Sequence, residues 1–114
     1  MSPADEHRNI LYICGPYRAS TVHGMKRNIR LAEKAMEWAW VHGWTPLCPH
    51  TNSAFIDGLV PDRVILAGYC KLLLRCDAVL LLRGYEESEG AVAELSLAEE
   101  RNITILPWVY HEEM

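Results

Sequence analysis

The sequence lacks several features that would place it in a large class of proteins. It has no apolar run long enough to cross a bilayer and no signal-peptide pattern at its amino terminus. Basic residues are in the minority, with 11 Lys and Arg against 15 Asp and Glu, so its charge does not favour binding to a nucleic-acid polymer. We therefore expect a cytoplasmic protein whose partners include neither a membrane nor DNA or RNA.

Metal-binding spacings and internal repeats are missing as well. The four cysteines stand in apolar runs without the paired spacing of a zinc site, and the five histidines are scattered. Small buried thiols of this kind are typical of a reducing compartment. The pattern predicts no metal and no cofactor.

The chain does have enough apolar residues for one core. Hydrophobic residues occupy 50% of its 114 positions, which suits one domain. We expect a flexible, largely polar amino terminus over residues 1–9 and a single domain over residues 10–114.

Strand-like and helix-like patterns alternate along this domain. Strands are predicted at 10–14, 44–48, 78–82 and 103–106, with a further edge strand considered at 108–110. Helices are predicted at 22–42, from 61 or 62 to 75, and at 88–101. The alternation predicts an α/β fold, a flavodoxin- or Rossmann-like three-layer sandwich with a parallel sheet. Because Pro46 lacks a backbone donor, its strand belongs at an edge, and the strand order becomes 2-1-3-4(-5).

This strand order brings two unusual loops to one crevice. In a doubly wound sheet, ligands bind where the order reverses, beyond the carboxyl ends of the first and third strands. Those ends carry the loops 15–21 and 84–88. A third loop is expected at 49–53, with Phe55 and Ile56 as its apolar anchors.

Residues 77–94 carry the functional prediction. Gly84 ends a buried strand, and Ser88 is a good N-cap for the helix that follows. At about 100° per residue, Glu94 lies among small and apolar residues of this helix, namely Gly90, Ala91, Leu97 and Ala98. It is either an ordinary solvated glutamate or a carboxylate held in an apolar site.

Other candidates surround this position. The amino end of the Ser88 helix presents N–H groups suited to an anion, and Gly90 permits close approach. Arg18 either contacts a phosphate or is a solvated loop residue. Tyr12 either donates to a carboxylate or is simply core, and His50 has a ligand-binding or a structural role.

The helix predicted at 22–42 is apolar on more than one face. Its core stripe comprises Met25, Ile29, Ala32, Met36 and Ala39. Further apolar surface comes from Leu31, Ala35, Trp38, Trp40 and Val41. The surplus predicts a homo-oligomer, the alternative being a strand or loop that covers it.

Several segments resemble the nucleoside 2-deoxyribosyltransferase superfamily. They are residues 11–18, 48–50, 75–78 and 88–94, and the likeness runs from about Ile10 to Leu106. It is greatest to small bacterial and phage domains of unknown function, with similarity to 2′-deoxynucleoside 5′-phosphate N-hydrolases.

The resemblance implies a reaction at a sugar. Glu94 would attack the anomeric carbon of a 2-deoxyribose and release the base, and Tyr12 would orient that carboxylate. The residue matching Ser88 is an Asp in the transferases but a Ser in the monophosphate hydrolases, where it helps to bind phosphate with an Arg matching Arg18. The substrate-binding candidates are Gly15, Pro16, Tyr17, Arg18, His50, Tyr69, Gly84, Ser88 and Gly90.

One position departs from the superfamily pattern. Tyr69 stands where the characterised branches have an Asp thought to handle the leaving base, and a tyrosine is a poor base near neutral pH. Asp57 or Asp62 are candidate substitutes. Two functions therefore follow: cleavage or transfer of a nucleoside or nucleotide N-glycosidic bond, or a non-catalytic nucleotide-binding module. A flavin-binding or phosphoacceptor protein is a more distant third.

Overall fold

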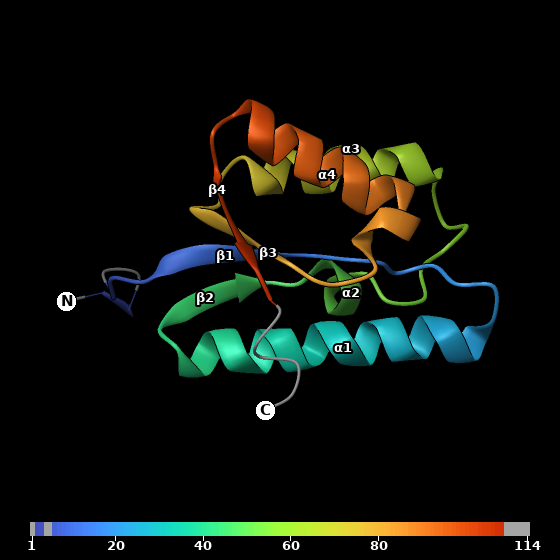
Figure 1. Ribbon diagram of the computed structural model, residues 1–114, viewed down its shortest axis with the longest axis horizontal. Coiled ribbons are helices and arrows are strands. Elements are labelled where there is room, and N and C mark those ends of the chain that lie inside the picture. Colours follow the sequence, from blue (N-terminus) through green and yellow to red (C-terminus); the bar gives the residue numbers. More distant parts are fainter. Residues whose placement is uncertain (1, 4–5, 109–114) are drawn as a thin grey trace.

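A computed structural model describes residues 2–3 and 6–108 (Figure 1). The elements are β1 (Asn9–Cys14), α1 (Val22–Val41), β2 (Trp44–Leu47), α2 (Pro49–Asn52), α3 (Asp62–Leu73), β3 (Ala78–Leu81), the 3-10 turn η2 (Tyr85–Glu87), α4 (Glu89–Glu100) and β4 (Thr104–Pro107). Of the edge strand considered at 108–110, only Trp108 is described. It is buried, and its N–H donates to the carbonyl of Leu81 at 3.0 Å.

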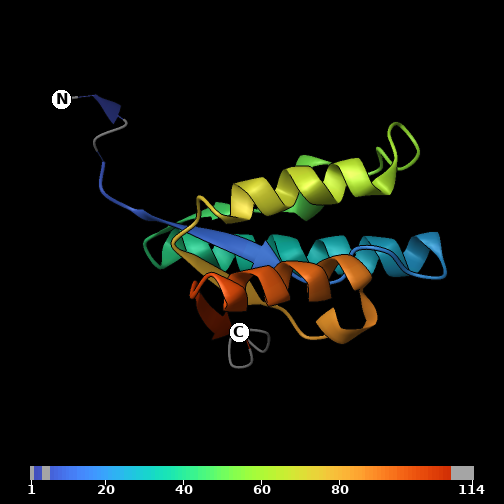
Figure 2. The same cartoon turned by 90° about the horizontal axis from the view of Figure 1, so that it is seen from above.

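The sheet has the predicted topology. Its order is β2-β1-β3-β4 and every neighbouring pair is parallel. The strand that contains Pro46 lies at an edge. α1 covers one face, and α3 and α4 lie side by side on the other, whereas the short α2 follows the carboxyl end of β2 beside α1 (Figures 1 and 2). The α/β class and the three-layer arrangement are therefore confirmed.

Alternation along β1 divides its side chains between the two faces. Leu11 and Ile13 pack into the core beside α1, whereas Tyr12 and Cys14 pack into the core beside α3 and α4. All four are fully buried. Because successive strand residues point to opposite faces, Tyr12 and Cys14 come to lie beneath α4.

Asp77 ties the start of β3 to β1. Its N–H donates to the Ile10 carbonyl at 2.9 Å, and its Oδ2 accepts from the Ile10 N–H at 2.7 Å. The bond from the Ile10 N–H to the Asp77 carboxylate thus adds a side-chain hydrogen bond to the backbone pairing of β1 with β3. Asp77 therefore has a structural role at the start of β3.

The surface of α1 is less apolar than the sequence indicates. Ala35, predicted to add surplus surface, is fully buried with Ala32 and Ala39, because small residues let the helix lie close to the sheet. Trp38 packs on the same core. Trp40 and Val41 remain exposed, at 49% and 80%.

Three local predictions are wrong. Residues 49–52 form the short helix α2, since Pro49 is well suited to a first helical turn. Phe55 and Ile56 are not anchors, because 57% and 37% of their surfaces are exposed. Asn9, assigned to the flexible amino terminus, is the first residue of β1.

None of the helices in the described ranges is both long and apolar enough to span a bilayer.

Candidate functional site

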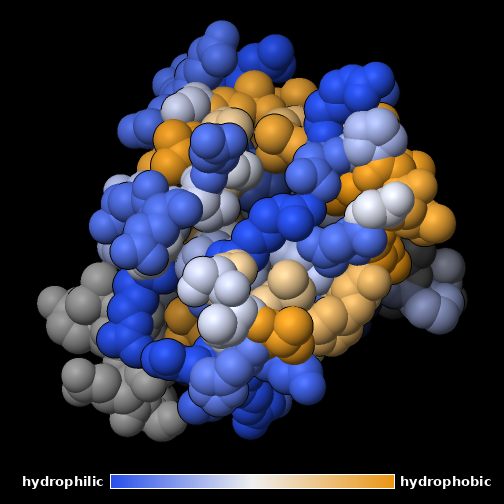
Figure 3. Space-filling model, turned by 90° about the vertical axis from the view of Figure 1, so that its right-hand side faces the viewer, coloured by the Kyte–Doolittle hydropathy of each residue, from blue (hydrophilic) through white to orange (hydrophobic). Residues whose placement is uncertain are grey.

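A cleft of about 670 Å³ lies beyond the carboxyl ends of β1 and β3. Its walls come from the loop after β1, from α2 and the segment that follows it, from the first half of α3, and from η2 with the start of α4. Figure 3 faces this end of the molecule, where hydrophilic and hydrophobic residues adjoin. The volume suits a small organic ligand, and the location is the crevice that the strand order predicts.

Glu94 is the buried acid of this cleft. It lies on α4, whose N-cap Ser88 accepts a hydrogen bond from the Ala91 N–H at 3.2 Å. Only 8% of Glu94 is exposed, and Ala91 and Ala98 of the same helix are buried with it. Burial raises the pKa of the Glu94 carboxyl from 4.5 to about 7, although Tyr12 and Cys14 act in the opposite direction. The carboxyl therefore changes charge near neutral pH.

Two β1 side chains hold the Glu94 carboxyl. The Tyr12 hydroxyl donates to Oε2, and the Cys14 thiol lies 3.7 Å from Oε1. Burial, followed by the charge of Glu94, raises the pKa of both Tyr12 and Cys14. Both groups consequently keep their protons and act as donors.

His50 holds the loop after β1 instead of facing a ligand with its ring N–H. Its Nε2 lies 3.2 Å from the Gly15 carbonyl and 3.0 Å from the Pro16 carbonyl. Since carbonyls only accept, Nε2 carries the proton. Burial lowers the pKa of His50, which favours the neutral ring. Gly15 also requires the absence of a side chain, because a Cβ there would lie 2.8 Å from the Cβ of Leu82.

Arg18 is engaged by two carboxylates at the rim of the cleft. Its guanidinium contacts Asp57 at 3.1 Å and Asp62 at 2.7 Å. The neighbouring Tyr17 hydroxyl donates to Asp57 at 2.9 Å and accepts from the Phe55 N–H at 2.7 Å. Arg18 is thus exposed but paired, and it is not immediately available to a phosphate.

Tyr69 lines the cleft with its hydroxyl already bonded. The hydroxyl accepts from the Asn52 side chain at 2.8 Å and donates to the Ser53 hydroxyl at 2.8 Å. Its single proton is therefore directed to Ser53. To protonate a leaving base, Tyr69 would first have to break that bond.

Most predicted site residues meet here. Those that line the cleft are Gly15, Tyr17, Arg18, His50, Tyr69, Ser88, Gly90 and Glu94. Pro16, Gly84 and the fully buried Tyr12 do not line it. Gly84 has a φ of +84° and lies against the Pro16 ring, so this pair shapes the crossing of the two loops.

Sequence reasoning missed part of the charge around the cleft. Arg63, Glu87 and Glu89 line it, as do Asp57 and Asp62, which had been considered only as substitutes for the missing Asp. Glu87 and Glu89 are the sequence neighbours of the N-cap Ser88, so the cap motif was a signal that could have identified them. Nothing in the local pattern indicates Arg63. The lining is predominantly acidic, with two arginines among these seven charged residues when Arg18 and Glu94 are included.

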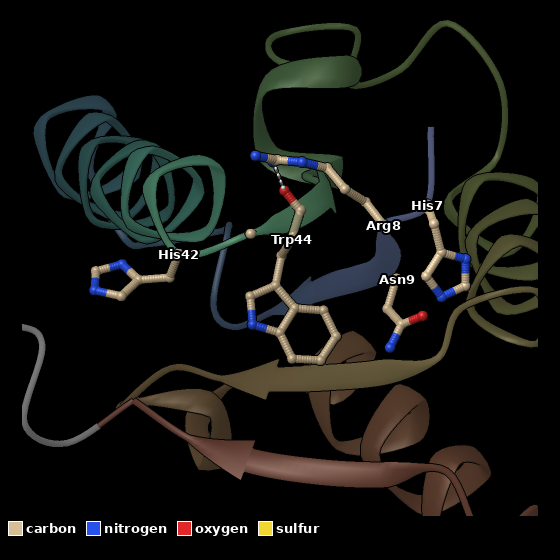
Figure 4. Close-up of a pocket in the computed structure, with 6 residues that line it drawn as sticks. His7, Arg8, Asn9, His42 and Trp44 are labelled. Atoms are coloured by element: carbon tan, nitrogen blue, oxygen red, sulfur yellow. Dashed lines mark hydrogen bonds between the residues drawn. The ribbon is translucent and has the colours of Figure 1, made fainter. Parts of the chain in front are cut away.

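A smaller hollow of about 300 Å³ is lined by His7, Arg8, Asn9, His42, Gly43 and Trp44 (Figure 4). It lies at the opposite end of β1 from the cleft. Arg8 donates to the Trp44 carbonyl at 2.8 Å and to the Trp40 carbonyl at 3.2 Å. Its guanidinium therefore fastens the segment before β1 to the turn after α1.

No group of three or more His, Cys, Asp or Glu side chains in residues 2–3 and 6–108 is arranged to hold a metal ion.

A protein-family model described as a domain of unknown function (DUF7768) matches residues 9–107. No curated protein matches the chain.

Proposed function

The chain belongs to this family of unknown function (DUF7768), and we propose that it cleaves or transfers the N-glycosidic bond of a nucleoside or nucleoside 5′-monophosphate. One observation carries the proposal: Glu94 is buried in the lining of the crevice at the strand-order reversal and is bonded to Tyr12. A carboxylate removed from water and oriented by a neutral donor is suited to attack a sugar carbon. The likeness to the nucleoside 2-deoxyribosyltransferase superfamily supports the same reaction.

In the proposed reaction, ionised Glu94 attacks the anomeric carbon. A carbon–oxygen bond forms as the bond to the base nitrogen breaks, and the departing base takes up a proton. Water or a second base then displaces the sugar from Glu94 and restores the carboxylate. Tyr12 keeps the carboxylate in place throughout.

The substrate is a small molecule in this proposal. The start of α4 favours a phosphate, because the Ser88 cap adds no charge and the helix end is electropositive. Arg18 contributes to phosphate binding only after leaving Asp57 or Asp62. While Arg18 stays paired with these carboxylates, the acidic lining of the cleft favours uncharged nucleosides over nucleoside 5′-monophosphates.

A non-catalytic nucleotide-binding module is the second candidate. It is favoured by the hydrogen bonds of Tyr69, whose proton goes to Ser53, and by the contacts that engage Asp57 with Arg18 and Tyr17. Neither group is then a ready acid for the leaving base. The module would stabilise on binding a nucleotide without releasing base.

Base release from purified protein distinguishes the two. The protein is incubated with the common nucleosides and nucleoside 5′-monophosphates, ribo and deoxy, and free base is measured by chromatography. We expect release that Glu94→Ala abolishes and Glu99→Ala, on the exposed face of α4, leaves intact. Release from none of the substrates, together with thermal stabilisation by nucleotides, would favour the binding module.

We also propose that the protein is a cytoplasmic homo-oligomer. Support for the location comes from its four free cysteines, three of them buried. Support for assembly comes from the exposed apolar residues at the end of α1, Trp40 and Val41.

A further inference from the structure

Cys14 occupies an unusual place beside the proposed nucleophile. It is the last residue of β1 and is fully buried. Its Sγ lies 3.5 Å from the Ala91 carbonyl and 3.7 Å from Glu94 Oε1. One thiol proton therefore has two acceptors within reach.

The charge of Glu94 determines which acceptor is stronger. A protonated carboxyl is a weak acceptor, so the backbone carbonyl of Ala91 then takes the thiol proton. An ionised carboxylate is a much better acceptor, because a charge-assisted hydrogen bond is roughly twice as strong as a neutral one. Burial keeps Cys14 protonated by raising its pKa, so the donor is present in both states.

We propose that Cys14 is a positioning residue whose S–H turns from the Ala91 carbonyl to Glu94 Oε1 when Glu94 ionises. Tyr12 already holds Oε2, so the thiol immobilises the second oxygen and favours the ionised carboxylate. A role of Cys14 in catalysis rests on the proposed function. The coupling between the Cys14 thiol and the Glu94 carboxyl does not rest on that function.

Other titratable groups near Glu94 come from each element packed around it. Tyr12 faces it from β1, and the pKa of Cys70 of α3 is raised by burial and then by the charge of Glu94. The remaining charged and titratable side chains of the cleft are Tyr17, Arg18, His50, Asp57, Asp62, Arg63, Tyr69, Glu87 and Glu89. Because all of these are unchanged by a substitution at Cys14, comparing variants isolates the thiol.

The test is a pH titration of the Glu94 side-chain carboxyl by carbon-13 NMR. Wild type is compared with Cys14→Ala, Cys14→Ser and Cys48→Ala. Cys48 is a matched control, because it is a buried cysteine in the core on the other face of the sheet. Glu94→Gln identifies the resonance.

We expect the titration midpoint to rise by about 0.5 to 1 pH unit in Cys14→Ala, since a donor to the ionised form is lost. It should fall in Cys14→Ser, because a hydroxyl is the stronger donor, and stay unchanged in Cys48→Ala. A purely structural role for Cys14 predicts the reverse sign in Cys14→Ala, because water entering the vacated space would lower the midpoint.

A midpoint in Cys14→Ala equal to or below that of wild type overturns the inference. If Cys14→Ala does not fold, Cys14→Ser is the deciding variant. A Glu94 midpoint in Cys14→Ser that equals or exceeds that of wild type then overturns the inference. The titration needs no turnover, so the two proposals fail separately. If the midpoints shift as expected but no base is released, the enzymatic function is rejected and the coupling between Cys14 and Glu94 is kept. If base is released but the midpoints do not respond to the Cys14 substitutions, the coupling is rejected and the enzymatic function is kept.

Discussion

Glu94 makes the protein less stable as its surroundings become more alkaline. Its pKa is about 7 in the folded chain against 4.5 as an ordinary glutamate, so between these values the folded state binds more protons than the unfolded state. The stability associated with this group is fully present below the unfolded pKa and is lost as pH rises through the folded pKa. Over that interval the loss amounts to about 3 kcal/mol.

Glu94→Gln should therefore stabilise the protein above neutral pH. The amide cannot ionise and still accepts from Tyr12, so we expect a gain of about 1 to 3 kcal/mol at alkaline pH and little difference at acid pH. Urea denaturation at the two pH values measures this. Glu99→Gln, on the exposed side of α4, is the control. Equal stability of wild type and Glu94→Gln at alkaline pH would contradict the burial argument.

Tyr12→Phe tests the donor that orients Glu94. Loss of the hydroxyl removes a hydrogen bond to the ionised form, so kcat/KM for base release should fall about 10- to 100-fold near neutral pH.

For wild type, kcat/KM should rise with pH through a midpoint near the Glu94 pKa of about 7, and Tyr12→Phe should move that midpoint upward. Tyr85→Phe, outside the cleft lining, serves as control. A rate that falls through the same range would show that the protonated carboxyl is the active form.

At the scale of elements, the start of α4 combines an observed helix cap with the proposed phosphate site. Ser88 caps the helix while Thr21 caps α1 in the same way, with its hydroxyl accepting from Gly24 at 2.9 Å. Each cap removed by alanine should cost about 1 kcal/mol. Denaturant melts of Ser88→Ala and Thr21→Ala measure the two costs.

Ser88→Asp separates the two roles of this residue. An aspartate caps a helix as well as serine does, so stability should be retained. Its charge repels a phosphate, so affinity for nucleoside 5′-monophosphates should fall about tenfold or more, while that for nucleosides stays the same. Calorimetric titration with matched ligands measures both. An equal fall for both ligand classes would show that the phosphate does not lie at this helix end.

The loop after β1 contacts the start of α3 through the ion pair between Arg18 and Asp62. Its partners are exposed, so Asp62→Asn should change stability by less than about 0.5 kcal/mol. The freed guanidinium charge should raise affinity for nucleoside 5′-monophosphates about two- to fivefold and leave nucleosides unaffected. Glu33→Gln, which removes a distant partner of Arg30, is the control. No gain in nucleotide affinity would assign Arg18 to loop structure alone.

At the scale of the whole molecule, the apolar end of α1 is the surface on which assembly is proposed. Arg8 lies over the exposed Trp40, 5.8 Å from the ring centroid, and covers part of it. We expect light scattering to give a dimer or larger species at micromolar concentration. Trp40→Glu should give a monomer that still unfolds cooperatively, with a denaturation midpoint below that of wild type because assembly stabilises the folded chain. A wild-type monomer at that concentration would remove the proposal.

The architecture could be predicted because its signals are local. Buried parallel strands appear as continuous apolar runs, and caps such as Ser88 mark helix starts at single positions. Pro46 identified the edge strand, and the strand order then located the crevice. Helical periodicity placed Glu94 among small and apolar residues but left open whether it is solvated, and its burial was decided by the packing of α4 on the sheet. By contrast, Ala35 was assigned to the wrong surface, because its small size is compatible with either side of a helix until the packing distance is known.

The sequence by itself determined the sheet order and the crevice and made Glu94 a candidate for it, since hydrophobic periodicity and helix caps act over a few residues. The tertiary structure alone decided which partners those groups have. Tyr12 and Glu94 are separated by 82 positions, Arg18 and Asp62 by 44, and His50 and Gly15 by 35. Hydrogen bonds and ion pairs of this kind depend on atoms that folding brings together, and no local pattern in the chain encodes their geometry.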